Sequence, residues 1–376
     1  MQMKFGILGA ALCAAISLLH AGNDPGQKIK TAMEDMIAKN EIPGAVTVVV
    51  TRTGLAHLGV EGYADAAHTR PLQKDSIFWI ASMTKPVTAV AVLMMQDEGK
   101  LSIDDPLVKY IPGFDPRITL KHMLTHTSGM GEGTPDELKT AKTLADLVPI
   151  YTSKPVGFTP GTQWKYCQSG INMLGRVVEI VSKQPLQDFF AARIFRPLGM
   201  KDTTFYPVAA QMARVVTPAK RGEDGKLTDG AVSLLYGKPA TATDRYPAAN
   251  GGLYSTGPDY AKFAQMLLNG GSLNGKTYLS KAAFAQMTSN QTGSIKAGFI
   301  PGHAWGLGVG VVTEPQGQTA MVQAGTFGHG GAYGTQAWID PKSGKAWILM
   351  VQRMNFKNSD DSPVRLAFQT AAASSN

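Results

Sequence analysis

Apolar residues change their spacing along the chain, and the changes outline a sheet interrupted by helices. Residues 45–50 form a run rich in β-branched side chains, and residues 55–63 form a second strand-like run after a polar turn at Thr53-Gly54. Strand-like runs return only after Gly251, at 305–312, 321–323, 334–339 and 346–351. Strands near both ends with helices between them predict one antiparallel sheet built from both chain ends.

Between these runs the apolar residues recur every three or four positions, which is the helical period. The part from 105 to 250 is mostly helical, and its loops are rich in Pro and Gly. We therefore expect an α/β fold with an inserted all-helical lobe, divided as 22–104, 105–250 and 251–376. The expected helices share this period: 28–38, 87–98, 119–126, 145–151, 170–182, 186–195, 258–268 and 362–372.

The N-terminus has the pattern of a secretory signal peptide. Lys4 precedes an apolar run over residues 5–19, and small Ala21 stands before a polar segment. We expect residues 1–21 to be cleaved and the mature chain to be periplasmic or secreted. Lipidation at Cys13 is an alternative, but Leu12 is bulky where such a site needs a small residue. Removal of the signal leaves one cysteine, so an internal disulfide is impossible.

Composition narrows the function classes. The 376 residues carry a formal net charge of +8, but basic residues are scattered among acidic ones rather than clustered with aromatics. We expect no nucleic-acid partner. With no second long apolar run, we expect no stable membrane span after signal cleavage. The sequence leaves the oligomeric state open.

Candidate chemistry begins at Ser82-Met83-Thr84-Lys85, where a hydroxyl and an amine stand three residues apart. Residues at i and i+3 share a helix face, so Lys85 can reach the Ser82 hydroxyl. A lysine activates a serine only if burial or nearby positive charge lowers its pKa. Chance supplies about one such match in a chain of this length. An N-cap serine beside a solvated lysine is therefore the alternative.

Two other patterns match functional motifs without the context that those motifs need. Residues 270–277 fit the phosphate-binding pattern G-x-x-x-x-G-K-[ST], but an expected helix precedes them where a strand is required. His122 and His126 have the spacing of metal ligands on a helix, but no third ligand is evident. We expect neither nucleotide binding nor a metal, and no cofactor.

Two further segments carry candidate active-site residues. Residues 164–170 (WKYCQSG) place Tyr166 and an amide in a polar turn before a helix, and residues 327–332 (FGHGGA) precede an expected strand with glycines that let backbone approach a ligand. With Ser82 and Lys85, these segments resemble the three signature elements of the serine penicillin-recognising enzymes. The nearest resemblance is to class C β-lactamases, DD-peptidases, D-aminopeptidases and β-lactamase-like carboxylesterases. Supporting phrases stand at 124–129, 196–200 and 251–256.

The resemblance implies a role for each matching position. Ser82 would be the acylated nucleophile, and Lys85 and Tyr166 would share the acid–base work, with the ammonium favouring a phenolate at Tyr166. The N–H groups of Ser82 and Ala332, the latter at the start of the strand after His329, would form the oxyanion hole. The implied fold is an α/β sandwich with an all-helical lobe.

Two departures bear on the substrate. Gln168 stands where β-lactamases of this type usually carry Asn, and His329-Gly330-Gly331 replaces Lys-Thr-Gly. The permanent cation and the hydroxyl that hold a β-lactam carboxylate are both absent. We therefore expect an exported serine acyl-hydrolase, first for β-lactams or D-alanyl peptides. A carboxylesterase for short acyl esters is the alternative, and a penicillin-binding receptor that does not hydrolyse is the rival from another class.

Overall fold

The computed structural model describes residues 25–374. The molecule is built around a seven-stranded antiparallel sheet. Its strands run in the order β2-β1-β13-β12-β11-β10-β9, so β1 from the N-terminal part pairs with β13 from the C-terminal part. This confirms the sheet expected from both chain ends. The strands are β1 (Gly44–Thr51), β2 (Leu55–Gly62), β9 (His303–Trp305), β10 (Gly310–Val312), β11 (Phe327–Gly330), β12 (Gln336–Asp340) and β13 (Lys345–Met350).

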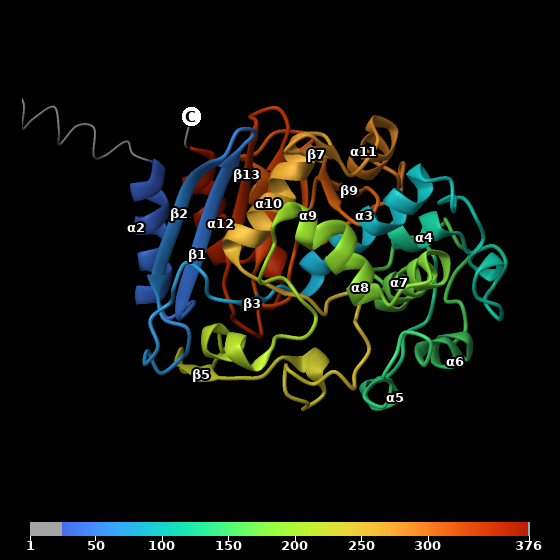
Figure 1. The fold of residues 1–376 in the computed structure, drawn as a ribbon. Coiled ribbons are helices and arrows are strands. Elements are labelled where there is room, and N and C mark those ends of the chain that lie inside the picture. The colour runs from blue at the N-terminus through green and yellow to red at the C-terminus, as the bar shows by residue number, and fades with distance from the viewer. Residues whose placement is uncertain (1–24, 375–376) are drawn as a thin grey trace, which may run out of the picture.

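Helices cover both faces of the sheet because its strands are apolar on both sides. In β1, Val46, Val48 and Val50 face one core, while Ala45 and Val49 face the other. This follows from the two-residue period of a strand. Helices α2 (Pro25–Ala38) and α12 (Pro363–Ala373) pack together on the second face, and α10 (Gly257–Leu268) lies on the first, in front of the sheet in Figure 1.

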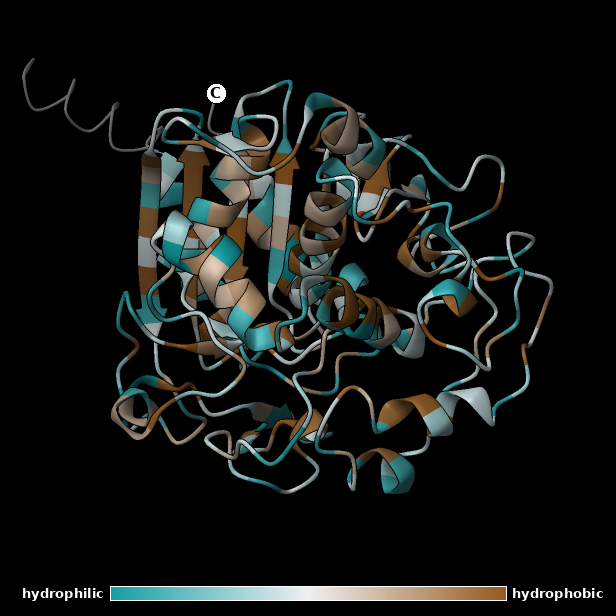
Figure 2. Cartoon of the chain, turned by 45° about the vertical axis from the view of Figure 1, so that its right-hand side comes forward, coloured by the Kyte–Doolittle hydropathy of each residue, from teal (hydrophilic) through white to brown (hydrophobic). Residues whose placement is uncertain are grey.

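The remaining helices gather beside the sheet (Figure 1). Residues 105–250 are not all helical, because they also contain long loops and the strand pair β4 (Ala219–Arg221) and β5 (Leu227–Asp229). Figure 2 shows apolar segments in the sheet and the adjoining helices, with largely hydrophilic loops around them. These helices are α3 (Thr84–Asp97), α4 (Leu120–Leu124), α5 (Pro135–Leu138), α6 (Leu147–Thr152), α7 (Gln168–Ser182), α8 (Leu186–Phe190), α9 (Arg196–Leu198) and α11 (Lys281–Thr288).

Helix α3 is buried on every side over its first twelve residues, whereas its sequence suggested a single apolar stripe. Its polar residues are satisfied by the neighbouring segment 249–253. Thr88 donates a hydrogen bond to the Ala249 carbonyl at 2.8 Å, and the Thr84 hydroxyl accepts one from the Leu253 N–H at 3.2 Å. This pairing explains how a helix with threonines and a lysine lies inside the core.

Three expectations about strands were wrong in detail. The run 305–312 is two strands, β9 and β10, because a turn with a left-handed Gly308 (φ 74°) separates them. Residues 321–323 form no strand and follow a short 3₁₀ turn, Gly317–Thr319. Residues 327–330 are themselves strand β11, so Ala332 lies in the turn before β12 and not at the start of a strand.

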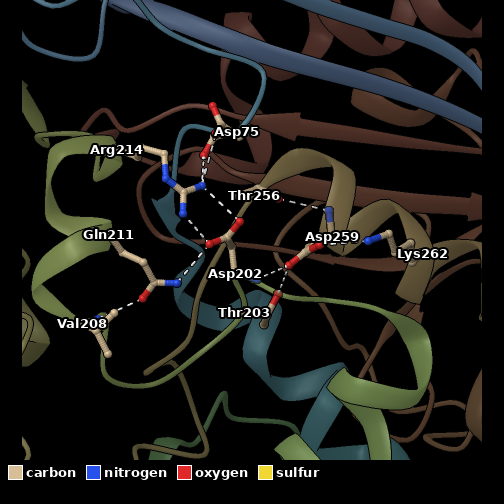
Figure 3. Close-up of polar contacts among 9 residues, drawn as sticks. All are labelled: Asp75, Asp202, Thr203, Val208, Gln211, Arg214, Thr256, Asp259 and Lys262. Carbon is tan, nitrogen blue, oxygen red and sulfur yellow. Dashed lines mark hydrogen bonds and ion pairs between the residues drawn. The ribbon is translucent and has the colours of Figure 1, made fainter.

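A polar cluster around Asp202 ties the helical part to the strand that leads to Ser82 (Figure 3). The Asp202 carboxylate accepts hydrogen bonds from both terminal nitrogens of Arg214, at 2.5 and 3.0 Å, and its N–H donates to Asp259 at the start of α10, at 2.7 Å. The Arg214 carbonyl in turn accepts from the Ile77 N–H at 2.8 Å. Ile77 directly precedes β3 (Phe78–Trp79), so the cluster fixes the approach to the Ser82 turn.

Candidate active site

Ser82 lies in a 3₁₀ turn, Ala81–Met83, immediately before α3 begins at Thr84. Every residue from 76 to 95 is buried except Ser82, which is partly exposed. The preceding strand β3 pairs with β6 (Tyr254–Ser255), and Ala81 adopts a left-handed φ of 46°. For a residue with a Cβ this conformation costs about 1–2 kcal/mol. The surrounding core therefore holds a sharp turn that presents the Ser82 hydroxyl.

Lys85 makes three contacts from a fully buried position. Its Nζ lies 3.1 Å from Ser82 Oγ, 2.8 Å from Gln168 Oε1 and 2.7 Å from the Asn250 carbonyl oxygen. Burial lowers the pKa of Lys85 to about 7, although the negative charge of Glu132 opposes the shift. Near neutral pH, Lys85 therefore exists in both protonation states.

The three contacts fit the neutral amine as well as the ammonium. The Gln168 Oε1 and Asn250 carbonyl oxygens can only accept hydrogen bonds, so each takes one N–H of Lys85. A neutral amine has two N–H groups and one lone pair, and the lone pair then faces Ser82 Oγ. This is the arrangement that a general base requires.

Gln168, one of the two departures that bear on the substrate, contacts Lys85 in the structure. Its Oε1 accepts from Lys85 and also from Asn250 Nδ2, at 2.9 Å. Helix α7 begins at Gln168, two residues earlier than its apolar pattern indicated. The Glu132 carboxylate explains this, because it accepts from the Gln168 and Ser169 N–H groups at 2.5 and 3.1 Å and satisfies the first turn.

Tyr166 connects the lysine to the glycine-rich segment. Lys85 Nζ lies 4.6 Å from the centre of the Tyr166 ring, and Tyr166 Oη lies 3.4 Å from His329 Nε2. Burial raises the pKa of Tyr166 above its ordinary value, although a hydrogen bond with Ser82 opposes the change. This direction disfavours the phenolate that the resemblance implies, because burial penalises the charged form of the phenol.

His329 is neutral at physiological pH. Burial, followed by the charge of Lys85, lowers its pKa to about 3. Its Nδ1 lies 2.7 Å from the Gly330 carbonyl oxygen, which can only accept, so Nδ1 carries the proton and Nε2 accepts from Tyr166. Both ring nitrogens are therefore occupied, and the lowered pKa leaves the imidazole without a positive charge.

The turn after β11 packs closely against the Ser82 turn. A Cβ at Gly331 would collide with the Thr335 hydroxyl and with the carbonyl oxygen of Ile80, the second residue before Ser82. The next residue, Ala332, is exposed, and among residues 25–374 no acceptor engages its N–H. Gly331 thus permits the close approach of this turn to the residues that precede Ser82.

Aromatic rings form one wall of the site. The Phe299 ring lies 4.8 Å from that of Tyr166 and 5.5 Å from that of Trp164, and the Trp305 ring lies 5.5 Å from that of His329. Phe299 remains 39% exposed and borders a cavity of about 820 Å³ formed largely by residues 293–304. An apolar group on a substrate could therefore contact Phe299 beside Tyr166.

The other motif matches have structural roles. Residues 270–277 form a small hairpin of β7 (Ser272–Leu273) and β8 (Lys276–Thr277), with helix α10 before it. His122 completes the N-terminal cap of α4 with Thr119, whereas His126 lies beyond that helix and packs among the aromatic rings. Within residues 25–374, no group of three potential ligand side chains could hold a metal ion.

Sequence reasoning missed three residues that shape the site: Asn250, Glu132 and Arg365. Asn250 supplies an acceptor to Lys85, and Glu132 caps the helix that carries Gln168. Arg365 donates to the turn that carries Ala332. Only Asn250 had a signal in the sequence, since it directly precedes the phrase at 251–256.

The antiparallel sheet with its flanking helices is the fold of β-lactamases and penicillin-binding proteins, and the match to this family is consistent with a serine hydrolase. The chain belongs to the Beta-lactamase family, whose model matches residues 28–372.

Relatives in this family carry different names. Esterase EstB from Burkholderia gladioli is 28% identical over 361 residues, which cover 86% of this chain and 89% of that protein. Penicillin-binding protein 4 from Amycolatopsis lactamdurans is 29% identical over 282 residues, covering 72% and 71%. The solved structure of EstCE1, described as a hydrolase with promiscuous acyltransferase activity, has a TM-score of 0.78 at 21% identity, over 93% of this chain and 98% of that one.

Proposed function

We propose that this protein hydrolyses carboxylic esters through an acyl-enzyme on Ser82. The observation that carries the ester assignment is His329, which is neutral and uses both ring nitrogens inside the protein. A β-lactam or a peptide ending in D-alanine presents a carboxylate, and no permanent cation stands at this position to receive it. The exposed Phe299 ring favours an uncharged, apolar group instead. The relative named Esterase EstB supports this choice.

The proposed reaction begins with neutral Lys85 accepting the Ser82 hydroxyl proton as Oγ attacks the ester carbonyl carbon. The carbonyl oxygen becomes an oxyanion that the N–H groups of Ser82 and Ala332 stabilise. The C–O bond then breaks, and the leaving alkoxide takes the proton that Lys85 received, so the alcohol departs neutral. Water attacks the acyl-enzyme in the same way, again with Lys85 as base, and releases the carboxylic acid.

A substrate panel tests the assignment. Purified protein should hydrolyse p-nitrophenyl butyrate much faster than nitrocefin or a D-Ala-D-Ala peptide, and intact-mass analysis should show a transient butyryl adduct that Ser82→Ala lacks. Faster turnover of nitrocefin would favour β-lactam hydrolysis, and a lasting penicillin adduct would favour a receptor. Undiminished ester turnover by Ser82→Ala would refute the mechanism altogether.

We also propose export, on the pattern of residues 1–21, which lie outside the described residues. Among residues 25–374 no helix is both long and apolar enough to span a membrane. Sequencing the N-terminus of the protein isolated from its source cells should find Gly22 first. A chain that retains Met1 would contradict export by cleavage.

A further inference from the structure

The peptide unit between Gly331 and Ala332 is held through its carbonyl group. The Gly331 carbonyl oxygen accepts a hydrogen bond from Arg365 Nη2 at 2.8 Å. In a planar trans peptide the C=O and the following N–H point in opposite directions. The bond from Arg365 therefore also sets the direction of the Ala332 N–H.

Arg365 holds the whole turn and not just this one peptide. The same guanidinium donates to the Thr335 carbonyl at 2.7 Å and to the Gly334 carbonyl at 3.4 Å. A fourth N–H group, on Nη1, donates to the Asp360 carboxylate at 2.7 Å. A planar fork of fixed N–H groups suits this simultaneous contact with several acceptors, which a lysine ammonium could not reproduce.

Two other features show that the turn and the guanidinium fit closely. A Cβ at Gly330 would collide with the guanidinium of Arg365, so this glycine makes room for the charged group. Ser359 Oγ donates to the Ala332 carbonyl at 2.9 Å, which anchors the other side of the same residue. The Arg365 side chain is fully buried. It belongs to helix α12, which packs on the face of the sheet opposite to the face covered by α10.

We propose that Arg365, with Asp360 as its counter-ion, is a positioning residue for the oxyanion-binding N–H of Ala332. The inference rests on the proposed function, because it takes Ala332 as an oxyanion donor. Arg365 does not touch the substrate. It acts by fixing the peptide plane, so its loss should weaken stabilisation of the transition state more than binding of the ester.

The test compares Arg365→Met and Arg365→Lys with Arg353→Met. Arg353 is also a buried arginine paired with a carboxylate, that of Glu41 at 2.6 Å, and within the described chain its side chain makes no hydrogen bond to residues 331–335. We expect Arg365→Met to lose about 100-fold in kcat for p-nitrophenyl butyrate, as for a catalytic group displaced by about 1 Å, with little change in KM. Arg365→Lys should lose less, and Arg353→Met should retain kcat.

A boronic acid gives a second readout, because its adduct with Ser82 places an oxygen in the oxyanion hole. Affinity for phenylboronic acid should fall in Arg365→Met by a factor similar to that in kcat. A fluorophosphonate that reacts with Ser82 is allowed to label each protein to completion. Each kcat is then divided by the labelled fraction, so that it refers only to folded protein with a reactive Ser82. If Arg365→Met does not fold, Asp360→Ala replaces it, and its kcat should fall without a change in KM.

The outcomes separate the two proposals. If wild-type protein forms no adduct on Ser82, the proposed function fails. If wild-type protein forms the adduct and Arg365→Met keeps its kcat per labelled site, the positioning role of Arg365 is refuted. An equal loss of kcat in Arg353→Met would also refute it, because any buried arginine would then have the same effect.

Discussion

Replacement of Lys85 by methionine should abolish activity and change how stability depends on pH. Burial lowers the pKa of Lys85 from an ordinary value of 10.5 to about 7. A lowered folded-state pKa means that, between these two values, the unfolded chain binds a proton that the folded chain does not. Wild-type stability must then decrease as pH falls from 10.5 towards 7 and become level below 7.

The size of the effect follows from the shift. A difference of about 3.5 pH units corresponds to about 5 kcal/mol when fully developed, of which about 4 kcal/mol is present at pH 7 and about 2 kcal/mol at pH 9. Lys85→Met removes this destabilising contribution to the free energy of unfolding. It also leaves the Asn250 carbonyl oxygen without its Lys85 donor, at a cost of about 1–3 kcal/mol, whereas Gln168 Oε1 keeps its bond from Asn250 Nδ2. Because that cost does not depend on pH, it cancels when two pH values are compared.

Urea unfolding of both proteins at pH 6, 7, 8 and 9 measures the difference. The stability of Lys85→Met relative to wild type should rise by about 2 kcal/mol between pH 9 and pH 7 and change little from pH 7 to pH 6. Wild-type kcat/KM should rise through the same range, as Lys85 loses its proton and becomes a base. A relative stability that is constant between pH 9 and pH 7 would show that Lys85 keeps an ordinary pKa and would refute the reasoning.

Three further substitutions probe the neighbours of Lys85. Gln168→Leu removes an acceptor from Lys85 and should lower kcat/KM about tenfold to a hundredfold, while an unchanged value would mean that the amide does not orient the amine. Gly331→Ala forces a Cβ into occupied space and should cost about 1–3 kcal/mol in urea unfolding as well as activity, whereas Gly54→Ala, with nothing near its Cβ, should cost neither. His329→Lys should lower KM for p-nitrophenyl hemisuccinate relative to the butyrate, because the new cation can bind the hemisuccinate carboxylate. The same cation should lower the pKa of Lys85 and so move the acid limb of the pH profile of kcat/KM to lower pH. An unmoved limb would mean that the new cation does not act on Lys85.

The fold was largely predictable because its signals are local. The β-branched run at 45–50 and the helix expected at 258–268 can each be recognised from a few consecutive residues. The structure confirms both, as strand β1 and helix α10. Strand β11 was missed because Gly328 and Gly330 give it no strand pattern. Pairing with β10 and β12 makes it a strand, and that information lies in its neighbours.

The site was predictable where its residues are close in sequence and unpredictable where they meet across the fold. Ser82 and Lys85 share one helix entry, so their contact follows from spacing alone. The partner of Lys85 at Asn250 is 165 positions away, and only the packed structure brings the two together. The pKa of Lys85 has the same origin, because it depends on burial of α3 on all sides and not on the motif itself.

The pairing of β1 with β13 has a consequence for how the protein is made. During synthesis from the N-terminus, Val46 cannot pair in the sheet until Met350 has been made. The turn that carries Ala332 is not held until Arg365 follows, near the end of the described chain. A growing chain on the ribosome can therefore already contain Ser82, Lys85 and Tyr166 while the turn that carries Ala332, the oxyanion donor that we propose, is still not ordered. We expect nascent chains arrested before α12 to leave an ester probe intact, so that reactivity appears only when translation is nearly complete.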